Sequence, residues 1–176
     1  FDLDRTIWDF ETNSNNNIRY ILDEMSLSSI EKSKFCTVYK KHNKQLWEKY
    51  EQGIIDKETL RWKRFFDSFE EFGIYDIELA KQFGERYIDN MPNMTQLMPN
   101  AREVLETLFH YGCKMAIVTN GFKEVQYKKI KNASLEHYFR AVIVSEEIGY
   151  HKPSPMVFKR AMTALKANKE NTLMVG

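Results

Sequence analysis

The sequence predicts an α/β fold in which a parallel sheet core carries an inserted bundle of helices. Residues 101–176 alternate between amphipathic stretches and short apolar runs, an order typical of strands joined by crossover helices. Residues 18–87 show the helical period alone. Phe1–Asp4 has the composition of the last residues of a strand, so the helical stretch is predicted to interrupt the chain after the first strand.

The inserted stretch predicts a small helical bundle. Its apolar residues recur at helical spacing, Gly53 interrupts the pattern, and the carboxylate of Asp56 suits the N-cap of the next helix. We expect helices over residues 18–25, 35–50, 56–69 and 79–87.

The remaining stretch predicts the rest of the sheet. Gly112 suits a helix end and Pro155 suits a first helical turn. We expect helices over residues 101–111, 122–132 and 155–165, and strands over 113–119, 141–144 and 172–175. Strands separated by helices pair in parallel through right-handed crossovers.

These patterns divide the chain into two domains. We predict a core made of residues 1–11 and 95–176 and a helical cap domain over residues 12–94, with the change of pattern near Pro92 and Pro99. The chain opens without Met on the end of one predicted strand and stops on the end of another. We therefore expect the natural protein to extend beyond both ends.

Composition excludes several classes of protein. Hydrophobic residues at 43% and charged residues at 29% fit a soluble globular chain rather than a disordered or fibrous one. The net charge of +1 gives no general attraction to a nucleic acid polymer or an anionic membrane. No run approaches a membrane span of ~20 apolar residues and no leader pattern opens the chain, so we expect a cytoplasmic protein. Cys36 and Cys113 are expected to be reduced thiols, and the oligomeric state is left open.

Two acids follow the first predicted strand. Asp2 and Asp4 lie two residues apart, on the same side of an extended chain. One carboxylate can attack phosphorus while the other protonates the leaving oxygen and later deprotonates water. Two nearby carboxylates also require a counter-cation, and Mg²⁺ is the natural candidate because it prefers oxygen ligands and tolerates bound phosphate.

Polar residues also follow the next two predicted strands. Thr119, Asn120 and Gly121 precede a predicted helix and offer a hydroxyl and backbone N–H groups to a phosphate. Lys152 follows the third strand, and Pro153 disfavours helical geometry at that lysine. Since ligands bind beyond the carboxyl ends of parallel strands, we expect these residues and the two acids to meet at one sheet edge.

The residues resemble a known family. FDLDRTIW at 1–8, IVTNGF at 117–122, HKP at 151–153 and LMVG at 173–176 are similar to the motifs of the haloacid dehalogenase-like hydrolase superfamily. The resemblance implies a Rossmann-like core with an inserted helical cap, Asp2 as nucleophile, Asp4 as general acid and base, and Thr119 and Lys152 on the phosphoryl group. It also implies Mg²⁺ held by Asp2, by the main-chain carbonyl of Asp4, and by acids expected after Gly176.

The second acid distinguishes the phosphatases of this family from its dehalogenases. Dehalogenases lack the aspartate at the Asp4 position because halide needs no leaving-group proton, so Asp4 favours phosphate transfer. The segment 43–53, followed by Arg64, resembles the cap of bacterial pyrimidine 5′-nucleotidases. The expected substrate is a nucleoside 5′-monophosphate, with Trp47 or a neighbouring aromatic side chain stacking on the base and Asn43 and Arg64 forming hydrogen bonds with it. The competing interpretation places Trp47 in the cap core and Arg64 in solvent or in an ion pair.

Three alternatives remain open. The chain can be a phosphatase of another small metabolite, such as a sugar phosphate or phosphoglycolate. It can be a response-regulator receiver, although a receiver separates its acid pair from its phosphoacceptor by a helix and has no helical insertion of this length. It can also be a catalytically inactive module that binds a phosphorylated ligand.

Overall fold

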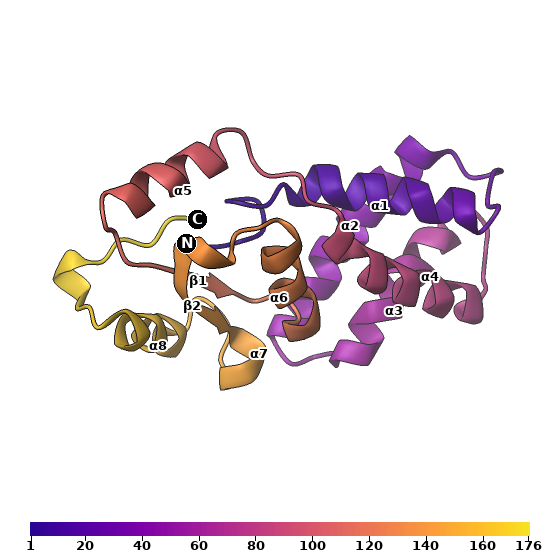
Figure 1. Ribbon diagram of the computed structural model, residues 1–176. Coiled ribbons are helices and arrows are strands. Elements are labelled where there is room, and N and C mark those ends of the chain that lie inside the picture. The colour runs from indigo at the N-terminus through magenta and orange to yellow at the C-terminus, as the bar shows by residue number, and fades with distance from the viewer. The chain divides into compact units, whose positions relative to one another are not determined.

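The computed structural model describes residues 1–176 and divides into two compact units (Figure 1). The core unit comprises Phe1–Asn13 and Pro92–Gly176, and the helical unit comprises Ser14–Met91. The helical unit is therefore a continuous insertion into the chain of the core unit. None of the helices is both long and apolar enough to cross a membrane.

The helical unit is built from four helices around a cluster of aromatic rings. They are α1 (Phe10–Glu24), α2 (Lys32–Glu51), α3 (Lys57–Glu70) and α4 (Ile77–Asn90), the first of which begins in the core unit. The ring of Phe65 stacks on Tyr39 at 5.0 Å and contacts Phe83 at 4.9 Å and Tyr87 at 5.1 Å. Gly84 allows α4 to approach α3 closely, because a Cβ there would lie 2.6 Å from a carbonyl oxygen of α3.

The prediction of a helix starting at Asp56 is confirmed. The Asp56 carboxylate accepts a hydrogen bond of 2.7 Å from the Thr59 backbone N–H, which lowers the pKa of this carboxyl below its ordinary value. The helix predicted from the spacing of Ile18, Ile21 and Leu22 is longer than that spacing indicates, because α1 begins at Phe10. Its first turns carry asparagines, and the buried Asn17 amide donates 2.9 Å to the Tyr87 carbonyl oxygen, a tertiary contact that apolar periodicity does not reveal.

The core unit is a mixed α/β unit with a parallel sheet. The strands β1 (Met115–Thr119) and β2 (Phe139–Val144) pair in parallel, with Thr119 opposite Val144. The surrounding helices are α5 (Ala101–His110), α6 (Lys123–Asn132), α7 (Ser145–Ile148) and α8 (Pro155–Leu165), with short 3₁₀ turns at Met91–Asn93, Glu136–Tyr138 and Lys169–Asn171. Val157 and Ala161 of α8 pack on Val118 and Ile143 of the sheet.

Residues near the two ends of the chain lie beside this sheet and are joined to it and to each other by a few backbone hydrogen bonds. The Phe1 nitrogen donates to the Ala116 carbonyl at 2.9 Å, and the Val118 N–H donates to the Phe1 carbonyl at 2.8 Å, as in a parallel ladder. The Asp2 N–H donates to the Val175 carbonyl at 2.8 Å. The predicted strands at residues 1–4 and 172–175 are therefore wrong as regular strands, because each makes too few ladder bonds, although both segments lie beside the sheet edge.

Two predicted boundaries of the inner strands are also wrong. The predicted strand 113–119 begins at Met115, because Gly112 takes φ +73° and the Cys113 N–H bonds the Leu108 carbonyl at 3.0 Å to close the end of α5. The strand predicted over 141–144 begins earlier, at Phe139. The helix α7 was not predicted at all, because four residues are too few to show a helical period. Cys36 is buried, Cys113 is exposed, and both are free thiols.

Candidate active site

Asp2 lies beside Lys152 in the core unit. The Lys152 Nζ is 2.6 Å from the Asp2 Oδ1, and the Leu3 N–H donates to the same oxygen at 2.7 Å. The second carboxylate oxygen of Asp2, Oδ2, accepts no hydrogen bond from the protein. One oxygen is thus fixed by two donors while the other keeps its lone pairs for a ligand or for attack on an electrophile.

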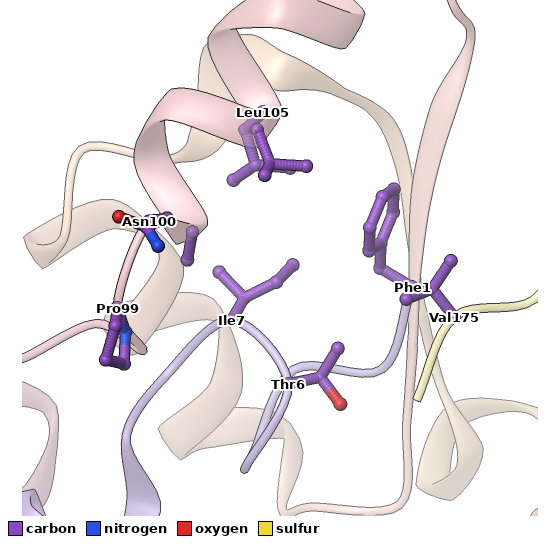
Figure 2. Close-up of a pocket in the computed structure, with 9 residues that line it drawn as sticks. Phe1, Thr6, Ile7, Pro99, Asn100, Leu105 and Val175 are labelled. Carbon is purple, nitrogen blue, oxygen red and sulfur yellow. The ribbon is translucent and has the colours of Figure 1, made fainter.

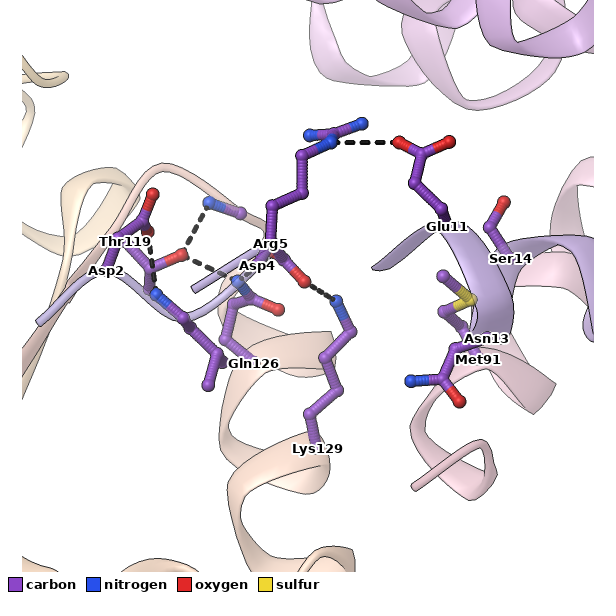
Figure 3. A network of polar contacts seen from close by, with 12 residues as sticks. Asp2, Asp4, Arg5, Glu11, Asn13, Ser14, Met91, Thr119, Gln126 and Lys129 are labelled. Atoms are coloured by element: carbon purple, nitrogen blue, oxygen red, sulfur yellow. Dashed lines mark hydrogen bonds and ion pairs between the residues drawn. The ribbon is translucent and has the colours of Figure 1, made fainter. Parts of the chain in front are cut away.

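Asp4 is held by two side chains of α6. The Lys129 Nζ lies 2.7 Å from the Asp4 Oδ1, and the Gln126 Nε2 donates to Oδ2 at 2.8 Å (Figure 3). Lys129 is only 3% exposed and its ammonium lies 4.0 Å from the centre of the Trp8 ring, so the cation is sheltered by an aromatic face. Both oxygens of the Asp4 carboxylate therefore have fixed partners.

Thr119 is the last residue of β1, and its hydroxyl belongs to the same polar cluster. Its hydroxyl oxygen accepts from the Gln126 Nε2 at 2.6 Å and from the Gly121 N–H at 3.2 Å, and the residue is 1% exposed. A threonine hydroxyl has two acceptor positions and one donor. Since both acceptor positions are taken, the hydroxyl proton is left to donate to a ligand oxygen.

The other two residues of the predicted phosphate loop, Asn120 and Gly121, also contact residues of the protein itself. The Asn120 side chain accepts from the Lys152 N–H at 2.8 Å and donates to the Lys152 carbonyl at 3.3 Å, so it fixes the backbone that carries this lysine. Gly121 makes room for a neighbour, because a Cβ there would lie 2.4 Å from the Gln126 Nε2. His151 stays outside this group, with its Nδ1 3.2 Å from the Ser145 hydroxyl.

Gln126 and Lys129 were not predicted as site residues from the sequence. Both lie on the buried face of α6 beside Val125 and Ile130, at the three-residue spacing that places side chains on one face of a helix. A polar pair on an otherwise apolar face was the available signal. The helix after β1 thus brings two polar side chains to the acids of the first segment.

The core unit also contains an apolar cavity, whose lining differs from the polar cluster in having no charged side chain. It has a volume of about 160 Å³ and is lined mostly by apolar side chains, including Phe1, Ile7, Leu105 and Val175 (Figure 2). It offers no charged side chain to an anion. The polar cluster, and not this cavity, has the groups that a phosphate requires.

The oxygen atoms at Asp2 and Asp4 fit a magnesium ion. The Asp2 Oδ2 keeps two lone pairs, one that can bind a metal and one that can attack, and the main-chain carbonyl of Asp4 is a further hard oxygen nearby in the chain. The described residues contain no group of three or more His, Cys, Asp or Glu side chains that can hold a metal. This donor set suits Mg²⁺, which keeps several waters and is bound through one or two carboxylates together with a substrate phosphate.

The helical unit places Asn43 and Arg64 together. The Arg64 Nη1 donates to the Asn43 Oδ1 at 3.0 Å, and the two residues are 3% and 4% exposed respectively. The Nε of Arg64 has no hydrogen-bond partner, and its guanidinium lies 5.0 Å from the Tyr87 ring centre. The interpretation of Arg64 as solvated or ion-paired is therefore wrong. Trp47 is partly buried and contacts Tyr50 edge-on at 5.6 Å.

Tyr87 lies beside the Arg64 guanidinium and carries no charge that could neutralise it. Burial raises the pKa of its phenol well above the ordinary value, so the ring beneath Arg64 stays neutral. The hydroxyl of Tyr87 lies 2.8 Å from the Ser14 hydroxyl. Arg64 is thus a buried cation that no carboxylate of the protein neutralises.

Paired acids, a hydroxyl and a lysine lie together in the core unit, and a carboxylate in such surroundings can act as a covalent nucleophile. The model of the haloacid dehalogenase-like hydrolase family matches residues 1–176, and the chain belongs to this family. The predicted family and the Rossmann-like core with an inserted helical bundle are confirmed.

Several relatives resemble the chain over its whole length. Pyrimidine 5′-nucleotidase PynA of Streptococcus pneumoniae is 28% identical over 100% of this chain and 73% of its own. Pyrimidine 5′-nucleotidase YjjG of Escherichia coli is 29% identical over 100% of this chain and 75% of its own.

Solved structures share the fold. The magnesium-bound HAD-hydrolase YfnB of Bacillus subtilis superposes with a TM-score of 0.81 at 25% identity, over 93% of this chain and 71% of its own. The L-2-haloacid dehalogenase of Xanthobacter autotrophicus shares the fold with a TM-score of 0.68 at 18% identity, over 96% of this chain and 64% of its own.

Proposed function

We propose that the chain is a Mg²⁺-dependent phosphomonoester hydrolase that forms an aspartyl phosphate on Asp2. The observation that carries this proposal is the Asp2 carboxylate, which is fixed through one oxygen by Lys152 and Leu3 and has the other free. A carboxylate oriented in this way can attack phosphorus without first breaking a hydrogen bond at the attacking atom.

The neighbouring side chains supply the remaining roles. The Lys152 ammonium and the Thr119 hydroxyl proton stabilise charge on the phosphoryl oxygens. The protonated form of Asp4 gives its proton to the leaving oxygen in the first step, and the carboxylate that results takes a proton from water in the second. Asp2 and the Asp4 carbonyl are the ligands that would hold Mg²⁺, which when bound neutralises phosphoryl charge. Asn120 and Gly121 act through the backbone of Lys152 and the placement of Gln126.

This proposal predicts metal-dependent release of phosphate. The purified full-length protein is expected to hydrolyse p-nitrophenyl phosphate with Mg²⁺. The rate is expected to fall at least about 100-fold in EDTA and to recover when Mg²⁺ is restored. Activity is read from nitrophenolate absorbance and from free phosphate. Turnover that is unchanged after exhaustive chelation would contradict the role of the metal.

We further propose that residues 12–94 act as a specificity cap and that the substrate is a nucleoside 5′-monophosphate. Two relatives that match this chain over its whole length are named pyrimidine 5′-nucleotidases. A pyrimidine base presents carbonyl oxygens that a guanidinium can bind. Arg64 is a buried cation with an unused donor, and Asn43 orients it. Trp47, one helical turn beyond Asn43, is the aromatic side chain available for stacking on a base.

Substitution of Arg64 tests this specificity. Arg64→Met is expected to raise KM for uridine 5′-monophosphate by about 10- to 100-fold, the effect of losing one hydrogen bond from a charged donor. KM for p-nitrophenyl phosphate, which has no base, is expected to change little. The control is Arg86→Met, which replaces an exposed arginine paired with Glu24 in the same unit. An equal loss with both substrates would contradict a role in base recognition.

A further inference from the structure

We propose that Gln126 is a positioning residue that fixes the Thr119 hydroxyl and the Asp4 carboxylate relative to each other through a single amide nitrogen. The inference rests on the proposed phosphatase function, because it assigns these two groups to the same reaction. In this assignment Gln126 does not contact the substrate, and its contacts are with Thr119 and Asp4. It acts by setting where the phosphoryl-binding hydroxyl and the general acid are held.

The hydrogen bonding of the amide determines its orientation. The Nε2 atom lies 2.6 Å from the Thr119 Oγ1 and 2.8 Å from the Asp4 Oδ2. A carboxylate oxygen can only accept, so the amide must present nitrogen and not oxygen at this point. The nitrogen carries two hydrogens, and each has one acceptor. The amide therefore bridges the two groups with no donor to spare.

The bridge also directs the proton of Thr119. Gln126 and the Gly121 N–H together occupy both acceptor positions of the Thr119 hydroxyl. The hydroxyl is left with its donor function alone, which is the function a negatively charged phosphoryl oxygen requires. A threonine without the Gln126 contact can rotate its proton toward other acceptors.

The protein is built to hold Gln126 in place. The residue is 1% exposed, and a Cβ at Gly121 would lie 2.5 Å from its amide carbon and 2.9 Å from its Cγ. The absence of a side chain at Gly121 is thus what allows the amide to reach the site. On the same helix, Lys129 holds the other oxygen of Asp4, which prevents the carboxylate from turning away from Gln126.

Fixing Asp4 matters most when the leaving group is poor. An alkoxide must receive a proton as it departs, whereas nitrophenolate departs without one, so a misplaced general acid slows alkyl esters selectively. A defect that only loosened the fold would slow both kinds of ester alike. The ratio of kcat/KM for the two substrates therefore separates positioning from general structural damage.

The test compares Gln126→Leu with wild type in the full-length protein with Mg²⁺. The measured quantity is kcat/KM for p-nitrophenyl phosphate divided by kcat/KM for the alkyl phosphate that the wild-type protein hydrolyses with the highest kcat/KM. This ratio is expected to rise at least about tenfold. The effect is expected to disappear when Gln126→Leu is combined with Asp4→Asn, because the residue to be positioned has then lost its acid. Lys128→Met, an exposed substitution on the same helix, is expected to leave the ratio unchanged.

Gln126→Glu gives a second measurement if the leucine variant unfolds. It keeps the shape of the side chain but places an acceptor against Asp4, so it is expected to raise the same ratio. An unchanged or lowered ratio in folded Gln126 variants of an active enzyme overturns the inference alone. Absence of turnover of either ester by the wild-type protein overturns the proposed function instead.

Discussion

Replacing Asp2 with asparagine is expected to lower kcat by at least about four orders of magnitude, as removal of a covalent nucleophile does in other enzymes. An amide oxygen is a poor nucleophile for phosphorus and carries no charge for Lys152 or Mg²⁺ to stabilise. The asparagine can still accept the Leu3 N–H, so the local backbone is expected to persist. Activity is measured as phosphate release under saturating substrate.

The control for this variant is Asp9→Asn. Asp9 accepts the Thr12 N–H at 3.0 Å at the start of α1, a role that asparagine fills equally well. Its activity is expected to match that of wild type. Activity of Asp2→Asn above about one per cent of wild type, with the asparagine verified intact by mass, would contradict nucleophilic catalysis by this residue.

Truncating Phe65 to alanine is expected to lower the free energy of unfolding of the helical unit by about 3–5 kcal/mol. The Phe65 side chain is completely buried, with ring contacts to Tyr39, Phe83 and Tyr87. Removing it takes away these contacts and leaves a cavity between α2, α3 and α4. Urea unfolding followed by far-ultraviolet circular dichroism measures the loss.

Tyr75→Ala is the control for this truncation, because its ring is 73% exposed in the same unit. Its effect is expected to stay within about 0.5 kcal/mol. A loss of less than about 1 kcal/mol for Phe65→Ala would mean that the aromatic cluster is not the core of the helical unit. Because the chain has two compact units, the transition is fitted with both one and two steps.

The sequence predicted those features that follow from local pattern. The rule that ligands bind beyond the carboxyl ends of parallel strands selected Asp2, Asp4, Thr119 and Lys152, whose catalytic roles stay predictions. The structure brings Lys152 to Asp2 at 2.6 Å, although these residues are far apart in the chain. The ends of two helices were also predicted from the sequence, at Asp56 and Gly112.

The remainder depends on tertiary contacts that local pattern does not encode. Polar side chains on helices are normally solvated, which is why Gln126, Lys129 and Arg64 were not recognised as buried. The part of Gly121 in a phosphate loop stays a prediction, and the structure adds that the missing side chain leaves room for Gln126. The role of a glycine in close packing becomes visible only when its neighbours are placed.

Trapping the covalent intermediate tests the nucleophilic role of Asp2 most directly. The Asp4→Asn variant is mixed with p-nitrophenyl phosphate, which needs little help to leave, and the second step is slowed because its general base is missing. The reaction is quenched, reduced with borohydride and analysed by peptide mass spectrometry. We predict substrate-dependent conversion of Asp2 to homoserine. Modification of a different residue, or continued turnover with Asp2 unmodified, would contradict an aspartyl phosphate at this position.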